Sequence, residues 1–194
     1  RGTGMVRTRG VAAQYLLTVS DETPAAGSQV TVVAQLADEH GHPVAEAGHT
    51  VEWEVTGEAS LSATSTVTDE WGRATVFVTV STAAGTDHVV RATDGGDESI
   101  SGEVTITTTA GPAAGYEVKV SDLAPRVGSQ VAVVAQLVDR YGNAVAEAGR
   151  EVEWSVTNEG QLSEASARTN EAGVAEVIVT VSTVAGTGHV VTAT

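Results

Sequence analysis

TVEWEVT, residues 50–56, alternates between apolar and acidic side chains along its length. One side of the stretch is apolar and the other acidic: Val51, Trp53 and Val55 against Glu52 and Glu54. Because successive side chains of an extended strand point to opposite faces, this period of two predicts a strand with one face in a core. The pattern recurs as EVEWSVT at residues 151–157, so the same element is expected twice.

The whole chain repeats in this way, at an offset of 101 residues and without insertion from residue 10 to residue 93. Identical blocks in the two copies include VVAQL, VAEAG and AGT. The offset also aligns Tyr15, Trp53 and His88 with Tyr116, Trp154 and His189. A period of this length is that of a domain, not of a solenoid repeat. We expect a leader and linker over 1–13, a first domain over 14–110, a linker over 111–115 and an incomplete second domain over 116–194.

Each copy reads as β-structure, with period-2 stretches between turns rich in Gly, Asp and Pro. Strands of the first copy are expected at residues 14–20, 28–38, 49–57, 60–68, 73–81, 86–93 and 101–109. Seven short strands with regular turns are typical of an immunoglobulin-like (Ig-like) sandwich. The predicted fold class is therefore all-β, with two tandem Ig-like β-sandwiches, the second lacking its own last strand.

Four motifs carry a more specific signal. They are DEHGHPV (38–44), VEWEV (51–55), TDEWGRA (68–74) and AGTDHVVRA (84–92), repeated as DRYGNAV, VEWSV, TNEAGVA and AGTGHVVTA. In these motifs the chain resembles the bacterial Ig-like domains of invasin and intimin type, the Big-1 family. The resemblance implies an extracellular or cell-surface role as a stalk or spacer, and it offers no catalytic residues to carry over.

Composition narrows the function further. The net charge is −15 and the sequence contains no cysteine, which excludes disulfides and thiolate metal sites. So acidic a chain argues against nucleic acid and anionic membranes as partners. Neither a Ser/His/Asp set nor a phosphate-binding loop recurs in both copies, so we expect no enzyme and no cofactor.

Metal binding is not expected either, although two loops contain candidate ligands. Asp94, Asp97 and Glu98 in DGGDES are weak candidates for Ca²⁺, which takes oxygen ligands from acidic loops. His40, His42 and His49 could share a transition metal, but their counterparts in the second copy are Tyr141, Asn143 and Arg150. A solvated loop is the favoured interpretation of that cluster.

The offset also relates the leader to the end of the first copy. It aligns residues 2–9, GTGMVRTR, with residues 103–110, EVTITTTA, which read as a last strand. The second copy stops at Thr194, before any such strand. The leading hypothesis is therefore a filament subunit that polymerises head to tail, donating residues 2–9 to the second domain of a neighbouring copy.

The donor side chains would be Thr3, Met5, Val6, Arg7 and Arg9. The acceptor groove would be lined by Val177, Val179, Val181, Val191 and Ala193. Arg7, which aligns with Thr108, and two glycines make the leader an imperfect donor. The alternative is a stalk or spacer segment of a longer surface adhesin, without polymerisation of its own.

Overall fold

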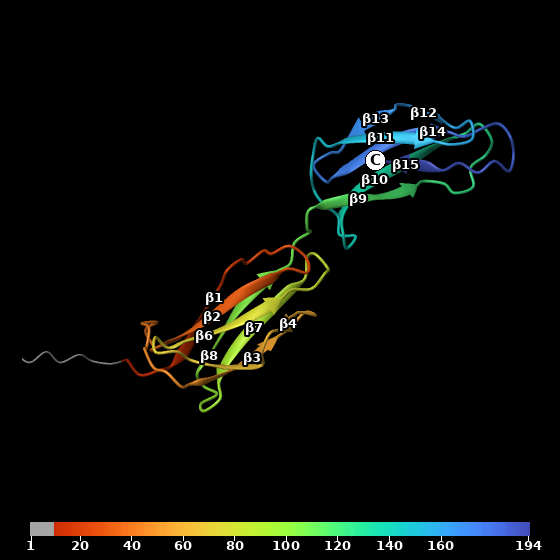
Figure 1. The fold of residues 1–194 in the computed structure, drawn as a ribbon. Coiled ribbons are helices and arrows are strands. Elements are labelled where there is room, and N and C mark those ends of the chain that lie inside the picture. Colours follow the sequence, from red (N-terminus) through yellow and green to blue (C-terminus); the bar gives the residue numbers. More distant parts are fainter. Residues whose placement is uncertain (1–9) are drawn as a thin grey trace, which may run out of the picture. The chain divides into compact units, whose positions relative to one another are not determined.

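The computed structural model describes residues 10–194, all as strands, turns and loops (Figure 1). The predicted donor residues Thr3, Met5, Val6, Arg7 and Arg9 lie outside the described residues. The chain divides between Thr109 and Ala110 into two compact units, called unit 1 and unit 2 below. Both are antiparallel β-sandwiches, so the predicted all-β, Ig-like class is confirmed.

Unit 1 consists of two four-stranded sheets packed face to face. Its strands are β1 (Gln14–Val19), β2 (Gln29–Ala37), β3 (Thr50–Val55), β4 (Ser60–Leu61), β5 (Ser65–Val67), β6 (Arg73–Thr79), β7 (Asp87–Asp94) and β8 (Ser101–Thr107). One sheet has the order β1-β2-β6-β4 and the other β5-β3-β7-β8. The period-2 stretches found in the sequence are thus the strands of both layers.

The prediction of a single strand over residues 60–68 is wrong. Residues 60–68 form two short strands, β4 and β5, which belong to opposite sheets. Ser62 still bonds to Phe77 of β6, whereas Thr64 accepts a hydrogen bond from Trp53 of β3. The chain therefore crosses from one layer to the other within three residues, which a pattern confined to one strand does not reveal.

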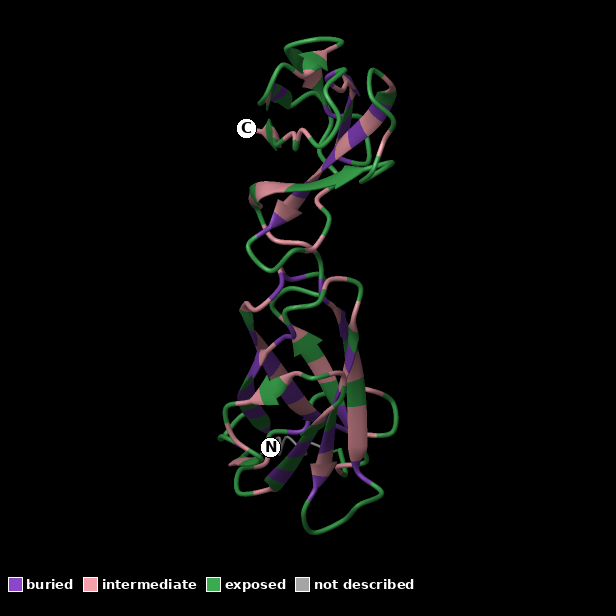
Figure 2. Ribbon diagram, turned by 90° about the vertical axis from the view of Figure 1, so that its right-hand side faces the viewer, coloured by how far each residue is buried: buried purple, intermediate pink, exposed green. Residues whose placement is uncertain are grey.

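The core of unit 1 lies between its sheets and takes one face of every long strand. Among the described residues, sixteen buried apolar side chains form one cluster, which includes Tyr15, Leu36, Trp53 and Ile106. In Figure 2 the strands of unit 1 alternate between buried and exposed residues, as a two-layer sandwich requires. Ile106 comes from β8, so the last strand contributes directly to this core.

Unit 2 repeats the architecture with seven strands. They are β9 (Ala113–Val120), β10 (Gln130–Asp139), β11 (Glu151–Val156), β12 (Gln161–Leu162), β13 (Ser166–Arg168), β14 (Val174–Thr180) and β15 (Val191–Ala193). The sheets have the orders β12-β14-β10-β9 and β13-β11-β15. Strand β9 already begins at Ala113, within the range 111–115 that the sequence assigned to a linker.

Unit 2 differs from unit 1 mainly where β8 would lie. In the described part of the chain no strand pairs with the outer edge of β15, and β15 has three residues where β7 has eight. The buried apolar cluster has eight members instead of sixteen among the described residues. Within the described residues, β15 is therefore shorter than β7, and its outer edge is uncovered.

Candidate functional site

In unit 1, strand β8 covers the side of the sandwich that is open in unit 2. In unit 1 it pairs antiparallel with β7 from Ser101 to Thr107, and Ile106 is fully buried. The residue two further along, Thr108, is also buried, at 1% exposure. Side chains at alternate positions of this segment thus enter the core, and the side chains of the residues between them face outward.

The same segment is held on its other side by the loop that follows β1. Thr107 N donates to Glu22 O at 2.9 Å, and Thr109 N donates to Pro24 O at 2.9 Å. Ala26 N donates to Thr109 O at 2.8 Å, and the bridge between Ala25 and Thr109 is parallel. The end of β8 therefore runs parallel to residues 22–26 and closes the sandwich.

A buried histidine, His88, forms a hydrogen bond with the side chain of Thr108. His88 Nδ1 lies 3.1 Å from the carbonyl oxygen of Thr56, so this nitrogen carries the proton and donates. Nε2 is then an acceptor, and the Thr108 hydroxyl donates to it at 2.8 Å. The backbone N–H of Ser81 approaches the same nitrogen at 3.4 Å. His88 is thus a buried core residue that fixes the hydroxyl at position 108.

In unit 2 the corresponding surface is an apolar groove with a volume of about 520 Å³. Its walls come from the end of β9, the loop 122–127, the start of β10, the end of β14 and the segment 182–191. Several apolar side chains at or beside it are exposed: Val120, Leu123, Val127, Val184 and Val190. The last four residues of β9 are all exposed as well, as Figure 2 indicates by colour.

The structure places the predicted acceptor residues in two groups. Val179, Val181 and Val191 line the groove. Val177 is fully buried in the core, and Ala193 packs against that core from β15. Neither Val177 nor Ala193 is among the residues that line the groove, so the prediction took in residues that lie behind its wall.

The predicted acceptor residues do not include the opposite wall of the groove. Val120, Leu123, Val127 and His189 also line the groove. The offset would have identified Leu123 and Val127, because they match Glu22 and Ala26, whose backbones bond to the end of β8. That signal depends on knowing the contact between residues 22–26 and 107–109, which the sequence does not show.

His189 keeps two of the three hydrogen bonds of His88. Its Nδ1 donates to Thr157 O at 2.9 Å, and its Nε2 accepts from Ser182 N at 3.1 Å. His189 lines the groove, and among the described residues no hydroxyl group bonds to its Nε2 as Thr108 bonds to His88.

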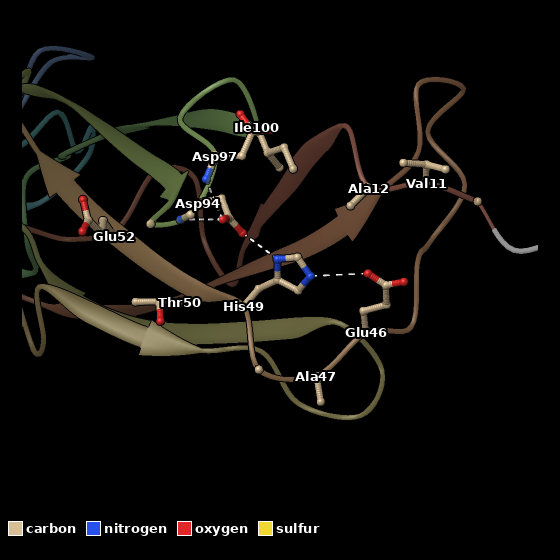
Figure 3. A pocket seen from close by; sticks show the side chains of 14 residues that line it. Val11, Ala12, Glu46, Ala47, His49, Thr50, Glu52, Asp94, Asp97 and Ile100 are labelled. Atoms are coloured by element: carbon tan, nitrogen blue, oxygen red, sulfur yellow. Dashed lines mark hydrogen bonds and ion pairs between the residues drawn. The ribbon is translucent and has the colours of Figure 1, made fainter.

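A second polar cluster lies at the opposite end of β7 in unit 1 (Figure 3). Asp94 Oδ2 accepts from Tyr15 OH at 3.0 Å. The same oxygen contacts His49 Nδ1 at 2.7 Å, as Figure 3 shows. On the opposite edge of the ring, His49 Nε2 lies 3.4 Å from Glu46 Oε2. Figure 3 shows His49 held between the two carboxylates at the edge of a hollow.

The electrostatics of this cluster follow from its contacts. The pKa of His49 is raised, first by the hydrogen bond to Asp94 and then by Glu46, against the effect of burial. Burial tends to raise the pKa of Asp94, but bonds from Gly96 N–H, His49 and Tyr15 outweigh it, and the pKa is lowered. Burial and the bond to Asp94 raise the pKa of Tyr15.

Of the calcium candidates, Asp94 belongs to this cluster, and the carboxylates of Asp94 and Asp97 accept hydrogen bonds from neighbouring residues. Asp94 Oδ1 accepts from the N–H groups of Gly96 and Asp97, and Asp97 Oδ1 accepts from Ser99 N and Oγ. No group of three His, Cys, Asp or Glu side chains among the described residues could hold a metal ion. Asp94, Asp97 and Glu98 thus form a hydrogen-bonded turn in which the carboxylates do not converge.

Two tandem Ig-like sandwiches with an open strand edge define the class of this protein. The structure is similar to the D00-D0 domain of Intimin, with a TM-score of 0.54 and 16% identity over 92% of this chain and 91% of that one. It also matches the D0-D1 domain of Intimin (TM-score 0.42, 22% identity, 91% and 88% covered) and invasin, described as a bacterial integrin-binding protein (0.44, 22%, 93% and 36%).

The fold is thus that of intimin-type bacterial Ig-like domains, and the resemblance noted in the sequence motifs is confirmed at the level of the fold. No protein-family model matches the sequence, and no curated protein sequence matches it. Among the described residues there is no helix long and apolar enough to cross a membrane.

Proposed function

We propose that this chain is a load-bearing spacer in an extracellular or cell-surface stalk built from tandem Ig-like units. The duplication of one unit and the fold shared with the D00-D0 domain of Intimin support this function better than they support a filament subunit. The observation that carries the proposal is the parallel hydrogen-bonded contact between residues 22–26 and 107–109 in unit 1. We call this contact the terminal clamp.

The terminal clamp joins the first and last segments of unit 1. The described chain enters unit 1 at one end of the sandwich and leaves it at the other (Figure 1). Tension along the chain therefore pulls β1 and β8 in opposite directions, and the parallel clamp strands slide past each other. The backbone bonds of Thr107, Thr109 and Ala26 lie across that direction and share the load, so they must break together. This geometry resists stretching more than one in which bonds open singly.

The connection between the units is short. Thr109 is bonded to Pro24 and Ala26 within unit 1, and Gly111 N donates to Asp139 Oδ2 at 2.8 Å within unit 2. Only Ala110 lies between these two anchored residues. A pulling force therefore passes from unit 1 to unit 2 through very little slack, as a spacer requires.

Force spectroscopy with two attachment geometries tests the proposal. The sequence has no cysteine, so paired Cys substitutions give unique handles. Val11→Cys with Ala110→Cys loads the terminal clamp in shear, and Thr23→Cys with Ala110→Cys peels it open. We expect a clearly higher unfolding force for the first pair. Equal forces in the two geometries would show that the clamp bears no load.

A second candidate function is the head-to-tail polymer, in which residues 2–9 of one copy enter unit 2 of the next. The open groove beside β15 favours it, because an uncovered strand edge with an apolar floor is a site for strand addition. The acidic body and the basic leader, with Arg1, Arg7 and Arg9, would favour this orientation of encounter.

Light scattering after size exclusion separates this candidate from the spacer. The polymer predicts concentration-dependent oligomers that disappear when residues 1–9 are deleted. A full-length chain that stays monomeric at high concentration would refute the polymer and leave the spacer function untouched.

A further inference from the structure

We propose that the turn between β5 and β6 of unit 1 is a binding site for a neutral saccharide. Three exposed side chains make up the site: the indole of Trp71, the guanidinium of Arg73 and the carboxylate of Asp69. The proposal goes beyond the spacer function and does not depend on it, because it concerns what unit 1 binds rather than the load it carries.

The backbone holds this turn in one conformation. Asp69 Oδ1 accepts hydrogen bonds from the backbone N–H groups of Trp71 and Arg73, both at 2.9 Å. Gln35 Nε2, from the neighbouring strand β2, donates to Trp71 O at 3.0 Å. The backbone of Trp71 is therefore fixed through both its N–H and its carbonyl group, and the indole ring projects from a rigid support.

Unit 2 forms the same turn without these side chains. The offset aligns three positions of the two turns: Asp69 with Asn170, Trp71 with Ala172, and Arg73 with Val174. Asn170 Oδ1 accepts from the backbone N–H groups of Ala172 and Val174, at 2.9 and 3.1 Å. The backbone of the turn therefore requires neither an indole nor a guanidinium, and their presence in unit 1 calls for another reason.

The three side chains of unit 1 keep their binding groups free. Trp71 is 55% exposed, although the guanidinium carbon of Arg73 lies 5.3 Å from the centroid of its ring. The indole N–H and the guanidinium form no hydrogen bond with any described residue. Asp69 Oδ2 also accepts none from the described residues, since Arg73 Nε is 4.0 Å away. One turn therefore offers an aromatic ring, a planar set of donors and a carboxylate oxygen.

This combination matches the chemistry of a pyranose ring. The C–H groups on one side of such a ring pack against an aromatic face, whose π electrons carry negative charge. The hydroxyl groups at its rim need both donors and acceptors. In the proposed complex Trp71 stacks on the sugar, Arg73 donates to one hydroxyl oxygen, and Asp69 Oδ2 accepts from a neighbouring hydroxyl group.

The charge of unit 1 favours a neutral ligand. Residues 15–109 contain fifteen Asp and Glu side chains against Arg73 and Arg91, so an anionic ligand would be repelled. A protein partner fits the turn less well, because the exposed neighbours of Trp71 are charged, including Glu70. Aromatic hot spots of protein interfaces lie instead in a packed centre that is depleted of charged residues.

Titration of the full chain with oligosaccharides tests the proposal. The probes are cellohexaose and the β-1,4-linked hexamer of N-acetylglucosamine, whose equatorial substituents leave flat C–H faces, and hexagalacturonate is the anionic counterpart. Isothermal titration calorimetry measures affinity and stoichiometry. Acrylamide quenching of tryptophan fluorescence locates the site, because Trp71 is exposed whereas Trp53 and Trp154 are buried. We expect a neutral hexamer to bind once per chain and to shield Trp71.

Three variants copy the residues of unit 2, so each should keep the turn. Trp71→Ala should abolish binding, and Arg73→Val and Asp69→Asn should each weaken it about three- to tenfold. Phe77→Ala is the matched control, because it removes another exposed aromatic ring of β6, and it should bind as the unchanged chain does.

Four results would each overturn the proposal. They are the failure of both neutral hexamers to bind, tighter binding of hexagalacturonate, unchanged binding in Trp71→Ala, and an equal loss of binding in Phe77→Ala.

Discussion

One substitution, alanine for threonine, changes the surroundings of the two buried tryptophans. In unit 1, Trp53 Nε1 donates to Thr66 Oγ1 at 2.7 Å. In unit 2 the offset puts Ala167 at the position of Thr66, and Trp154 Nε1 is buried without a hydrogen-bond partner among the described residues. An unpaired buried donor costs free energy because it has lost its water without gaining a partner.

Ala167→Thr should therefore stabilise unit 2. We expect its free energy of unfolding to rise by about 1 kcal/mol, the usual net value of one hydrogen bond. Urea titration of the full chain measures the change. Ala167→Val is the matched control, because valine has the shape of threonine without its hydroxyl. A gain from valine as large as that from threonine would show that packing, not the hydrogen bond, is responsible.

The cluster around His49 makes the stability of unit 1 depend on pH. A raised pKa for His49 means that the folded state binds its proton more tightly than the unfolded state does. This contribution is complete below the ordinary value of 6.5 and is lost as pH rises through the raised pKa. The lowered pKa of Asp94 contributes above its ordinary value of 3.8 and is lost as pH falls through the lowered one.

Thermal unfolding of unit 1 across pH checks this window. We expect the midpoint temperature to be highest between about 4 and 6.5, the two ordinary values, and to fall on either side. His49→Gln should remove the decline on the alkaline side. Unit 2 serves as an internal reference, because Arg150 occupies the position of His49 there and pairs with Glu147. An unchanged pH profile in His49→Gln would exclude this origin.

At the scale of elements, the closure of unit 1 depends on how closely β8 approaches β1. Gly102 lies in β8 against the backbone of Tyr15, and a side-chain carbon at this glycine would overlap the Tyr15 carbonyl oxygen. The two strands belong to different sheets. Their contact is therefore a corner of the sandwich, where only a residue without a side chain allows the layers to meet.

Gly102→Ala should push β8 away from β1 and destabilise unit 1 by about 1–3 kcal/mol, the cost of overpacking a well-packed site. Denaturant unfolding of the full chain measures the loss. Gly115→Ala in β9 is the control, because nothing lies within 4 Å of the carbon it adds. Equal effects of the two substitutions would show that the corner is more yielding than the contact suggests.

At the scale of the whole molecule, the two units share one architecture but differ in the number of strands that the described residues form. Unit 1 has a last strand that buries Ile106 and Thr108, and unit 2 has an open groove at the same place. Among the described residues the buried apolar cluster has sixteen members in unit 1 and eight in unit 2, and burying one branched apolar side chain is worth about 1.5–3 kcal/mol. The two units should not unfold together.

Calorimetry of the full chain should accordingly show two transitions, with unit 2 melting first. The Ala167→Thr variant assigns the lower transition, because it should move that one alone. A single transition, or a lower one that Gly102→Ala moves, would contradict this order.

Much of this fold can be predicted from local patterns in the sequence. Period-2 alternation and the 101-residue repeat determined that it is all-β and that it has two Ig-like copies. These features follow from neighbours along one strand, because alternate side chains share a face. Pattern alone placed Val177 and Ala193 in the groove, although they lie in and against the core.

Only the tertiary structure decided the features that join distant parts of the chain. The terminal clamp between residues 22–26 and 107–109, the bond from Thr108 to His88, and the division of residues 60–68 between two sheets all depend on segments far apart in sequence. No periodicity encodes which backbone lies beside which, because that is settled by how two sheets close over a shared core.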